Sequence, residues 1–228
     1  MQRATVAPVE RPTTIYLNDT EWLTVQTTPV DLTDWVTGYL FGEGVISRPE
    51  ELDRVVADED RGLVWVDLPD GRPPDPDRTL PLKPVAPGPQ VAAETLLVWM
   101  TQMLDDARLY QETGGMHVAA AFRLDTGERL LREDIGRHNA VDKVLGAALA
   151  AGWPGEQTVI LTSGRISYEM CTRLARFGAG LGVSRTAATD QAYGLATRLG
   201  IELVGYVRSA ASLIIYTEAH RVRRRVTA

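Results

Sequence analysis

The second half of the chain alternates short apolar runs with segments of helical spacing, and this alternation constrains the fold more than any other feature. The apolar runs have the length of buried strands and lie at 117–122, 158–162, 181–184 and 201–207. The segments whose apolar residues recur every three or four positions lie at 140–151, 168–177 and 190–199. Because helices that alternate with strands pack on the faces of a sheet, the pattern predicts a layered α/β domain.

The first half of the chain indicates a smaller α+β part. Two β-rich runs between residues 12 and 30 flank the turn-forming pair Asn18-Asp19, which predicts a hairpin. Apolar residues between 31 and 40 then follow at helical spacing. Further strands are predicted around 55–56 and 63–66. We therefore expect a small N-terminal part over residues 1–68.

A proline-rich stretch separates the two halves. Eight prolines lie from Pro69 to Pro89, and proline disfavours helix and central strand because it lacks a hydrogen-bond donor and fixes φ. We predict an exposed loop or linker over residues 69–90. Helical spacing resumes at 91–110, so the second domain is expected over residues 91–228.

Composition and charge exclude several classes of protein. The chain has 228 residues, of which 44% are hydrophobic and 24% charged, as in an average globular protein. Its net charge of -6 disfavours a nucleic-acid partner, and its one basic cluster, 220–225, is expected to be a solvated helix end. No apolar run is long enough to span a membrane or form a secretory leader. We expect a soluble, cytoplasmic protein without a nucleic-acid or membrane partner.

The single cysteine, Cys171, limits the chemistry further. One thiol cannot form an intramolecular disulfide, a CxxC redox pair or a zinc site built from several thiolates. The sequence also lacks the zinc deaminase signature, the G-x-S-x-G elbow, the Walker loop and the dinucleotide-binding glycine fingerprint. We therefore expect no metal site.

Four polar clusters lie at the ends of predicted strands, where α/β folds place their ligands. They occupy residues 113–117, 133–143, 162–169 and 184–189. The first contains the pair Gly114-Gly115, which would let the backbone approach a ligand closely. The third combines a glycine turn and hydroxyls with Arg165, which can bind a phosphate or carboxylate in a bidentate way. Together the clusters predict a pocket for a polyanionic ligand.

Two groups of candidate site residues come from these clusters. His117, Asp134 and His138 are candidate acid/base residues, and both histidines also suit a structural role as hydrogen-bonded core residues. The candidate ligand-binding residues of the clusters are Gly114, Gly115, Arg137, Asn139, Lys143, Ser163, Gly164, Arg165, Ser167 and Arg185.

A set of longer motifs is similar to those of one known family. The N-terminal half contains TPVDL at 28–32 and GYLFGEGVI at 38–46. The C-terminal half contains TGGMH at 113–117, EDIGRHNAVDK at 133–143, SGRISYEM at 163–170, GYVR at 205–208 and IYT at 215–217. The motifs span nearly the whole chain and resemble those of the FdhD family, the formate dehydrogenase accessory sulfurtransferases.

The resemblance implies a cytidine-deaminase-like α/β domain of three layers, joined to the small N-terminal part and assembled as a homodimer. Members of the family pass sulfur from a cysteine desulfurase to the molybdenum cofactor, bis-molybdopterin guanine dinucleotide, before the cofactor enters formate dehydrogenase. The desulfurase and formate dehydrogenase would be the partners of this chain. By similarity, the family's cofactor-binding segment maps onto Tyr206, Val207, Arg208, Ser209, Ala210 and Ala211.

The chain departs from the family where sulfur is carried. Family members hold a persulfide on a CxxC loop between the two halves, and the corresponding stretch here, KPVAPGPQ at 83–90, contains no thiol. A persulfide relay needs an exposed thiolate of low pKa, whereas Cys171 lies inside a predicted helix as an apolar filler. The segment 186–189 also lacks the proline usual in the family. We therefore do not expect the usual sulfur-transfer mechanism.

Three functions remain open. The first is an FdhD-like accessory protein that binds the molybdenum cofactor or its nucleotide for formate dehydrogenase maturation without the persulfide relay, with Arg165 and Arg208 in contact with the anion. The second is an enzyme that reuses the polar pocket for another small anionic substrate. The third is a sulfur carrier that uses Cys171.

Overall fold

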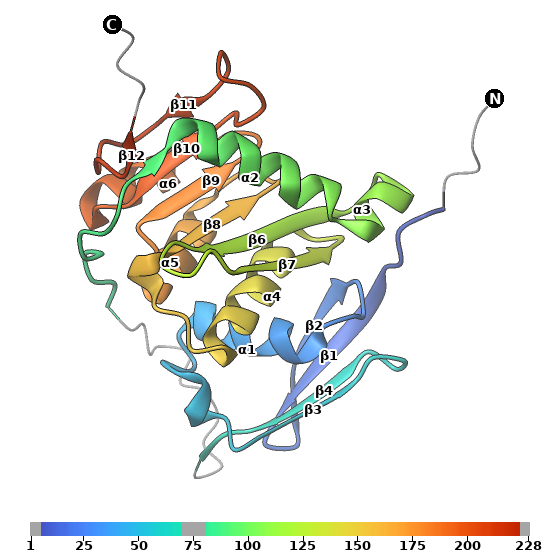
Figure 1. The fold of residues 1–228 in the computed structure, drawn as a ribbon. Helices are drawn as coiled ribbons and strands as arrows, with labels where there is room; N and C mark the ends of the chain where they lie inside the picture. The colour runs from blue at the N-terminus through green and yellow to red at the C-terminus, as the bar shows by residue number, and fades with distance from the viewer. Residues whose placement is uncertain (1–5, 70–80, 224–228) are drawn as a thin grey trace, which may run out of the picture.

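A central sheet of six strands organises the larger part of the protein (Figure 1). The computed structural model describes residues 6–69 and 81–223. The strands of the sheet are β6 (His117–Arg123), β7 (Arg129–Asp134), β8 (Thr158–Thr162), β9 (Leu181–Ser184), β10 (Glu202–Gly205) and β11 (Ile214–Ile215). Their order is β11-β10-β9-β8-β6-β7, with β8, β9 and β10 parallel and the other neighbours antiparallel.

Helices cover both faces of this sheet. One face packs against α2 (Ala93–Asp105), and the other face packs against α4 (Arg137–Ala150), α5 (Tyr168–Phe177) and α6 (Asp190–Leu199). The alternation of side chains along β6 shows the division, because Val118 and Ala120 lie in the cluster with α2 while Ala119 and Ala121 lie in the other cluster. The predicted three-layer, cytidine-deaminase-like α/β class is confirmed.

The N-terminal part is a second sheet with one helix. Its strands are β1 (Arg11–Leu17), β2 (Thr20–Thr27), β3 (Arg54–Asp58) and β4 (Leu63–Asp67), in the order β2-β1-β4-β3, and its helix is α1 (Leu32–Glu43). The turn between β1 and β2 is formed by Asn18 and Asp19 with φ of 48° and 62°, which suits a two-residue hairpin loop. Both the hairpin and the small α+β part are confirmed.

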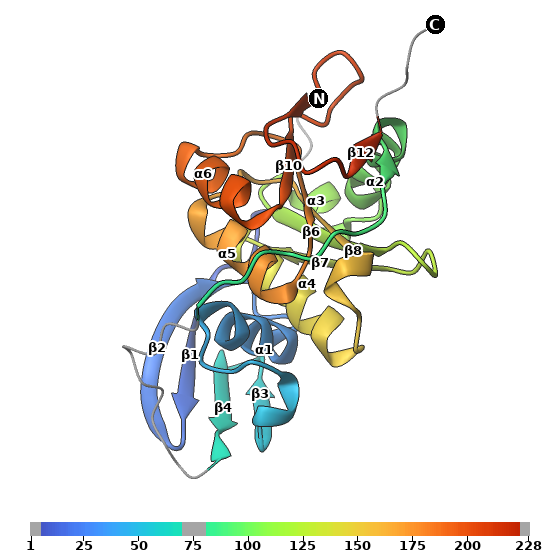
Figure 2. The ribbon, with the colours of Figure 1, turned by 90° about the vertical axis from the view of Figure 1, so that its left-hand side faces the viewer.

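Two glycines allow α1 and α4 to pack backbone against backbone. Figure 2 shows α1 between the small sheet and α4. A Cβ atom at Gly38 would lie 1.8 Å from the carbonyl oxygen of Asp142, and one at Gly146 would lie 1.9 Å from that of Asp34. Residues of both parts consequently belong to one hydrophobic cluster, and the boundary drawn at residue 68 stays a prediction.

The single helix predicted over 91–110 is instead two helices. α2 ends at Asp105, and α3 (Arg108–Thr113) begins after the buried residue Ala107. In the second half, a short 3-10 turn (Gly155–Gln157) precedes β8, and another (Pro49–Glu51) follows α1. No helix within the two described ranges is both long and apolar enough to cross a bilayer.

The end of the linker and the C-terminal segment pair with each other beside the larger domain. β5 (Val91–Ala92) pairs in parallel with β12 (Val222–Arg223), and Arg221 donates a hydrogen bond to the carbonyl oxygen of Ala86 at 2.5 Å. The helix end predicted at 220–225 is therefore wrong over its described residues, because tertiary contacts bury Arg221 and place its neighbours in a strand. The rest of that cluster, 224–225, and residues 70–80 of the predicted loop lie outside the described residues.

The close approach of α1 and α4 gives a stability test. We expect Gly146→Ala to lower the free energy of unfolding by about 2–3 kcal/mol, because its Cβ would overlap the Asp34 carbonyl. The control is Gly194→Ala on α6, where no atom lies within 4 Å of the new Cβ and stability should stay equal or rise. Urea unfolding of both variants measures the difference, and equal losses would contradict the backbone contact.

Candidate functional site

The predicted polar clusters meet at one edge of the central sheet. β8, β9 and β10 end there, β6 begins there and β7 ends there. The helices that follow, α4, α5 and α6, begin at the same edge with their backbone N–H groups directed toward it. Four arginines lie at the start of α4 or in the turns that follow β8, β9 and β10, and we call the site the arginine edge, after Arg137, Arg165, Arg185 and Arg208.

Arg137 is the first residue of α4 and is half-buried in the arginine edge. Its Nε atom is buried and has no hydrogen-bond partner in the described part of the chain, and its guanidinium forms no ion pair there. The backbone at Gly164 approaches it so closely that a Cβ on Gly164 would lie 2.8 Å from Cβ of Arg137. A half-buried cation without a partner is costly, so this position favours an anion.

Two histidines flank Arg137. Nδ1 of His117 lies 3.3 Å from Oγ of Ser163, and Nε2 of His138 lies 3.0 Å from Oγ of Ser167. Burial and the charge of Arg137 lower the pKa of His117, and the same two causes, with Arg173, lower the pKa of His138 to about 4. Both rings are therefore neutral near pH 7 and able to accept or donate hydrogen bonds.

The other arginines continue the edge toward β10. Ser184 donates a hydrogen bond to the carbonyl oxygen of Gly164 at 2.7 Å, which joins the turn of Arg165 to the turn of Arg185. Nε of Arg208 then donates to the carbonyl oxygen of Arg185 at 3.0 Å. None of these three arginines forms an ion pair with any carboxylate of the described ranges, so positive charge accumulates along the edge.

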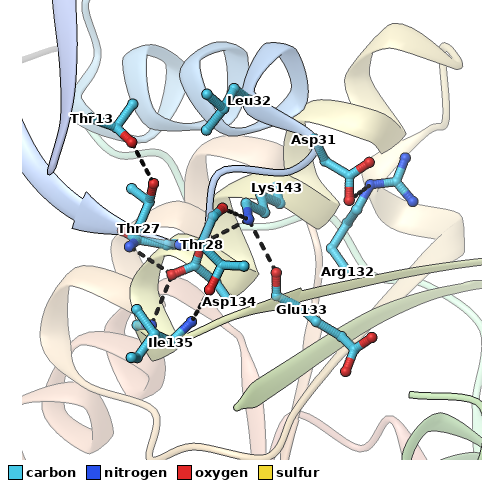
Figure 3. Close-up of polar contacts among 12 residues, drawn as sticks. Thr13, Thr27, Thr28, Asp31, Leu32, Arg132, Glu133, Asp134, Ile135 and Lys143 are labelled. Atoms are coloured by element: carbon cyan, nitrogen blue, oxygen red, sulfur yellow. Dashed lines mark hydrogen bonds and ion pairs between the residues drawn. The ribbon is translucent and has the colours of Figure 1, made fainter. Parts of the chain in front are cut away.

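Asp134 and Lys143 lie behind the edge in a buried network (Figure 3), to which the buried Asn139 also belongs. Nζ of Lys143 pairs with Oδ2 of Asp134 at 2.7 Å and donates to the carbonyl oxygens of Thr28 at 2.9 Å and Glu133 at 3.1 Å. These three contacts use all the donors of the ammonium group. The roles predicted for Asp134 and Lys143 stay predictions, and the structure gives them a clear packing role.

Thr28 is the residue of this network that sequence reasoning did not select. Its backbone N–H donates to Oδ2 of Asp134 at 3.1 Å, and its hydroxyl accepts from the N–H of Ile135 at 3.2 Å. Oδ1 of Asp134 accepts from Nδ2 of Asn139 at 2.9 Å. The available signal was the TPVDL motif at 28–32, but nothing in the sequence showed that it meets residues more than one hundred positions away.

The remaining predicted site residues differ in burial and in backbone conformation. Gly114 ends α3 with φ of 67°, and a Cβ atom placed on it would have no neighbour within 4 Å, while Gly115 packs against Pro8. Val207 is buried in the core. Tyr206, with φ of 52°, begins the turn that carries the exposed residues Ser209, Ala210 and Ala211.

Cys171 lacks the accessible, readily ionised thiol that a sulfur carrier needs. The side chain lies in α5 with no exposed surface, and burial raises the pKa of its thiol to about 12. A persulfide carrier needs an accessible thiolate. The expectation of an apolar filler agrees with this position, and the hypothesis of a Cys171 sulfur carrier is disfavoured.

The lowered pKa of His138 predicts how stability depends on pH. Its pKa is about 4 when folded against an ordinary value of 6.5, so the unfolded chain binds this proton more strongly. The contribution of His138 to stability is therefore lost as pH falls from 6.5 toward 4. We expect His138→Gln to gain stability relative to the wild type over this window, as measured by urea unfolding at several pH values. A difference that does not vary with pH would contradict this.

Comparisons with known proteins agree with the motifs and the fold. The FdhD/NarQ family model matches residues 8–223. The sulfur carrier protein FdhD of Bacillus subtilis is 34% identical over 236 residues, which cover 94% of this chain and 89% of that protein. The protein of the same name from Shouchella clausii is 31% identical over 239 residues, covering 93% and 88%.

A solved structure agrees as well. It is a crystal structure from Desulfotalea psychrophila, assigned as a formate dehydrogenase accessory protein, which superposes with a TM-score of 0.81 at 28% identity and covers 95% of this chain and 90% of that chain. The match extends over both the small N-terminal part and the three-layer domain. By its motifs, its fold and these matches, the chain belongs to the FdhD/NarQ family.

Proposed function

We propose that the chain is an accessory protein of formate dehydrogenase that binds bis-molybdopterin guanine dinucleotide, or its nucleotide part, at the arginine edge. It would do so without a persulfide on a CxxC loop, because its single cysteine is buried. The observation that carries the proposal is Arg137, a half-buried guanidinium whose Nε has no partner in the described ranges. The name of the solved structure supports the accessory role for formate dehydrogenase, whereas the two relatives are named sulfur carriers, a role that this chain would not perform.

The residues of the arginine edge fit the phosphates of such a ligand. A guanine dinucleotide carries several negative charges, and guanidinium groups bind phosphate oxygens in a bidentate way. Arg137, Arg165, Arg185 and Arg208 would hold these groups together with the N–H groups at the start of α4 and α5. Ser163 and Ser167 would add hydroxyl contacts beside the neutral histidines.

The bound cofactor would supply the redox centre of the client enzyme, and this chain would hold and protect the cofactor. Arg208 would contact the ligand directly, because this residue is exposed, and its guanidinium stands 5.8 Å from the ring centroid of Tyr206. The segment 206–211 carries both residues at the surface of the turn. A homodimer and a cysteine desulfurase partner stay predictions.

Calorimetric titration with GDP tests the binding site. We expect saturable binding by the wild type and at least a tenfold weaker affinity in Arg137→Met and in Arg208→Ala, since each variant removes hydrogen bonds to a charged ligand. The matched control is Arg198→Ala, an exposed arginine in the last turn of α6 at the opposite end of that helix, which should bind GDP as the wild type does.

Two results would contradict the proposal. One is a wild type that does not bind GDP. The other is equal weakening in all three variants, because net charge and not the arginine edge would then determine the affinity.

Cys171 gives an independent test of the sulfur-carrier alternative. After incubation with a cysteine desulfurase and cysteine, we expect the intact protein to keep its mass, because the thiol is buried and protonated. Mass spectrometry under native conditions measures this, with Cys171→Ala as the control. A gain of one sulfur atom in the wild type that is absent in the variant would restore the sulfur-carrier hypothesis.

The second candidate function is an enzyme that acts on another small anion at the same edge. The contact that favours it is the pair of His138 Nε2 and Ser167 Oγ at 3.0 Å, beside the unpartnered Arg137, because a neutral histidine can act as a general base. Turnover of a small phosphate or carboxylate substrate that is lost in His138→Ala, in a wild type that does not bind GDP, would favour this function.

A further inference from the structure

A separate cavity lies where the N-terminal part, the linker and α5 meet. Its volume is about 390 Å³, within the range of small-molecule pockets. The walls are apolar side chains of α1 and its continuation, Phe41 and Ile46, together with Leu82 of the linker and Ala175 of α5. Arg176, which also lines it, stands eight residues after Tyr168, so the cavity lies about 12 Å along α5 from the arginine edge.

Two cations, Arg176 and Lys83, face this apolar cavity without an anionic partner among the described residues. Nε of Arg176 is buried and makes no hydrogen bond with the described residues. Its guanidinium lies over Gly44, where a Cβ atom would come within 2.8 Å of Nη1. Lys83, on the linker, is exposed and lines the same cavity. Neither side chain forms an ion pair with any carboxylate of residues 6–69 or 81–223.

The carboxylate of Glu43 forms its ion pair with another arginine and not with Arg176. Glu43 contributes to the electrostatic field at Arg176, but its Oε1 pairs with Nη2 of Arg173 at 2.8 Å. Arg173 is itself buried and also pairs with Asp142 at 2.5 Å. Glu43 therefore pairs with Arg173, which also binds Asp142. The C-terminus of α1 at Gly44 adds only the partial negative charge of a helix end near Arg176.

The chemistry of the cavity defines the ligand that would fill it. A guanidinium with a buried, unbonded N–H favours an oxyanion, and carboxylates fit its planar fork. The walls of Phe41, Ile46, Leu82 and Ala175 favour a hydrocarbon body, whose burial stabilises the complex. A bare inorganic anion would satisfy the charge and leave these walls unfilled.

We propose that this cavity binds a small carboxylate with an apolar body, whose charge pairs with Arg176 and Lys83. The ligand would contact α1, the linker and α5 at once, so it would hold the linker against both parts of the protein. Because it binds the folded state, it would also raise the unfolding temperature in proportion to its concentration and affinity. The proposal concerns a site apart from the arginine edge and does not depend on GDP binding.

The test uses octanoate as the probe and the full-length protein. We expect saturable binding of octanoate by calorimetry, with a rise in unfolding temperature, and affinity about tenfold lower in Arg176→Gln. Lys83→Gln, an exposed position that should not affect folding, is expected to weaken binding severalfold. GDP affinity should stay at the wild-type value in Lys83→Gln, which separates this cavity from the arginine edge.

Two further probes and one variant complete the test. Octanamide, which keeps the hydrocarbon and lacks the charge, and inorganic phosphate, which lacks the hydrocarbon, should both bind more weakly than octanoate. No saturable binding of octanoate, or equal binding of octanamide, would overturn the proposal. Binding of octanoate that appears only after Asp70, Asp75 and Asp77 are all changed to Asn would also overturn the proposal. The carboxylates of the chain itself would then be the partners of Arg176 and Lys83.

Discussion

The buried pair of Lys143 and Asp134 is the interaction on which the rest of the site depends. Both groups have no exposed surface, and such a pair is tolerated only where further hydrogen bonds satisfy its remaining donors and acceptors. The partners come from Thr28 just after β2, Glu133 in β7, Gly136 just before α4, and Asn139 in α4. The pair therefore fixes where the N-terminal part meets the sheet and where α4 begins.

The start of α4 is what presents Arg137 and His138. Lys143 and Asn139 lie on the inner side of this helix, so the first turn is oriented with Arg137 toward the start of β6 and the end of β8. Burial and nearby positive charge keep the pKa of both histidines low, and the arginine edge presents cations and neutral hydrogen-bonding groups together. That combination suits a polyanion, and it needs no thiol, which agrees with a family member whose single cysteine is buried in α5.

One helix, α5, connects two places where the buried Nε of an arginine has no hydrogen-bond partner among the described residues, Arg137 and Arg176. Its first turn borders the arginine edge through Ser167, and its last turn carries Arg176 into the second cavity. Between them Arg173 forms the buried contacts with Asp142 and Glu43 that join α5 to α4 and α1. A ligand at either end would thus act on the same packed unit, whose helices are close enough to need glycine at Gly38 and Gly146.

The sequence alone determined the layered α/β class, the hairpin and the helices 168–177 and 190–199, because these depend on local spacing and turn chemistry. It also determined the family, since the motif at 133–143 is long and specific. Only the tertiary structure decided which residues of that motif face inward. Asp134 and Lys143 turn to Thr28 and Asn139 to Gln26, while Arg137 and His138 turn to the edge, and this division depends on a partner segment more than one hundred residues away. For the same reason Arg221, predicted in a solvated helix end, is buried against the linker.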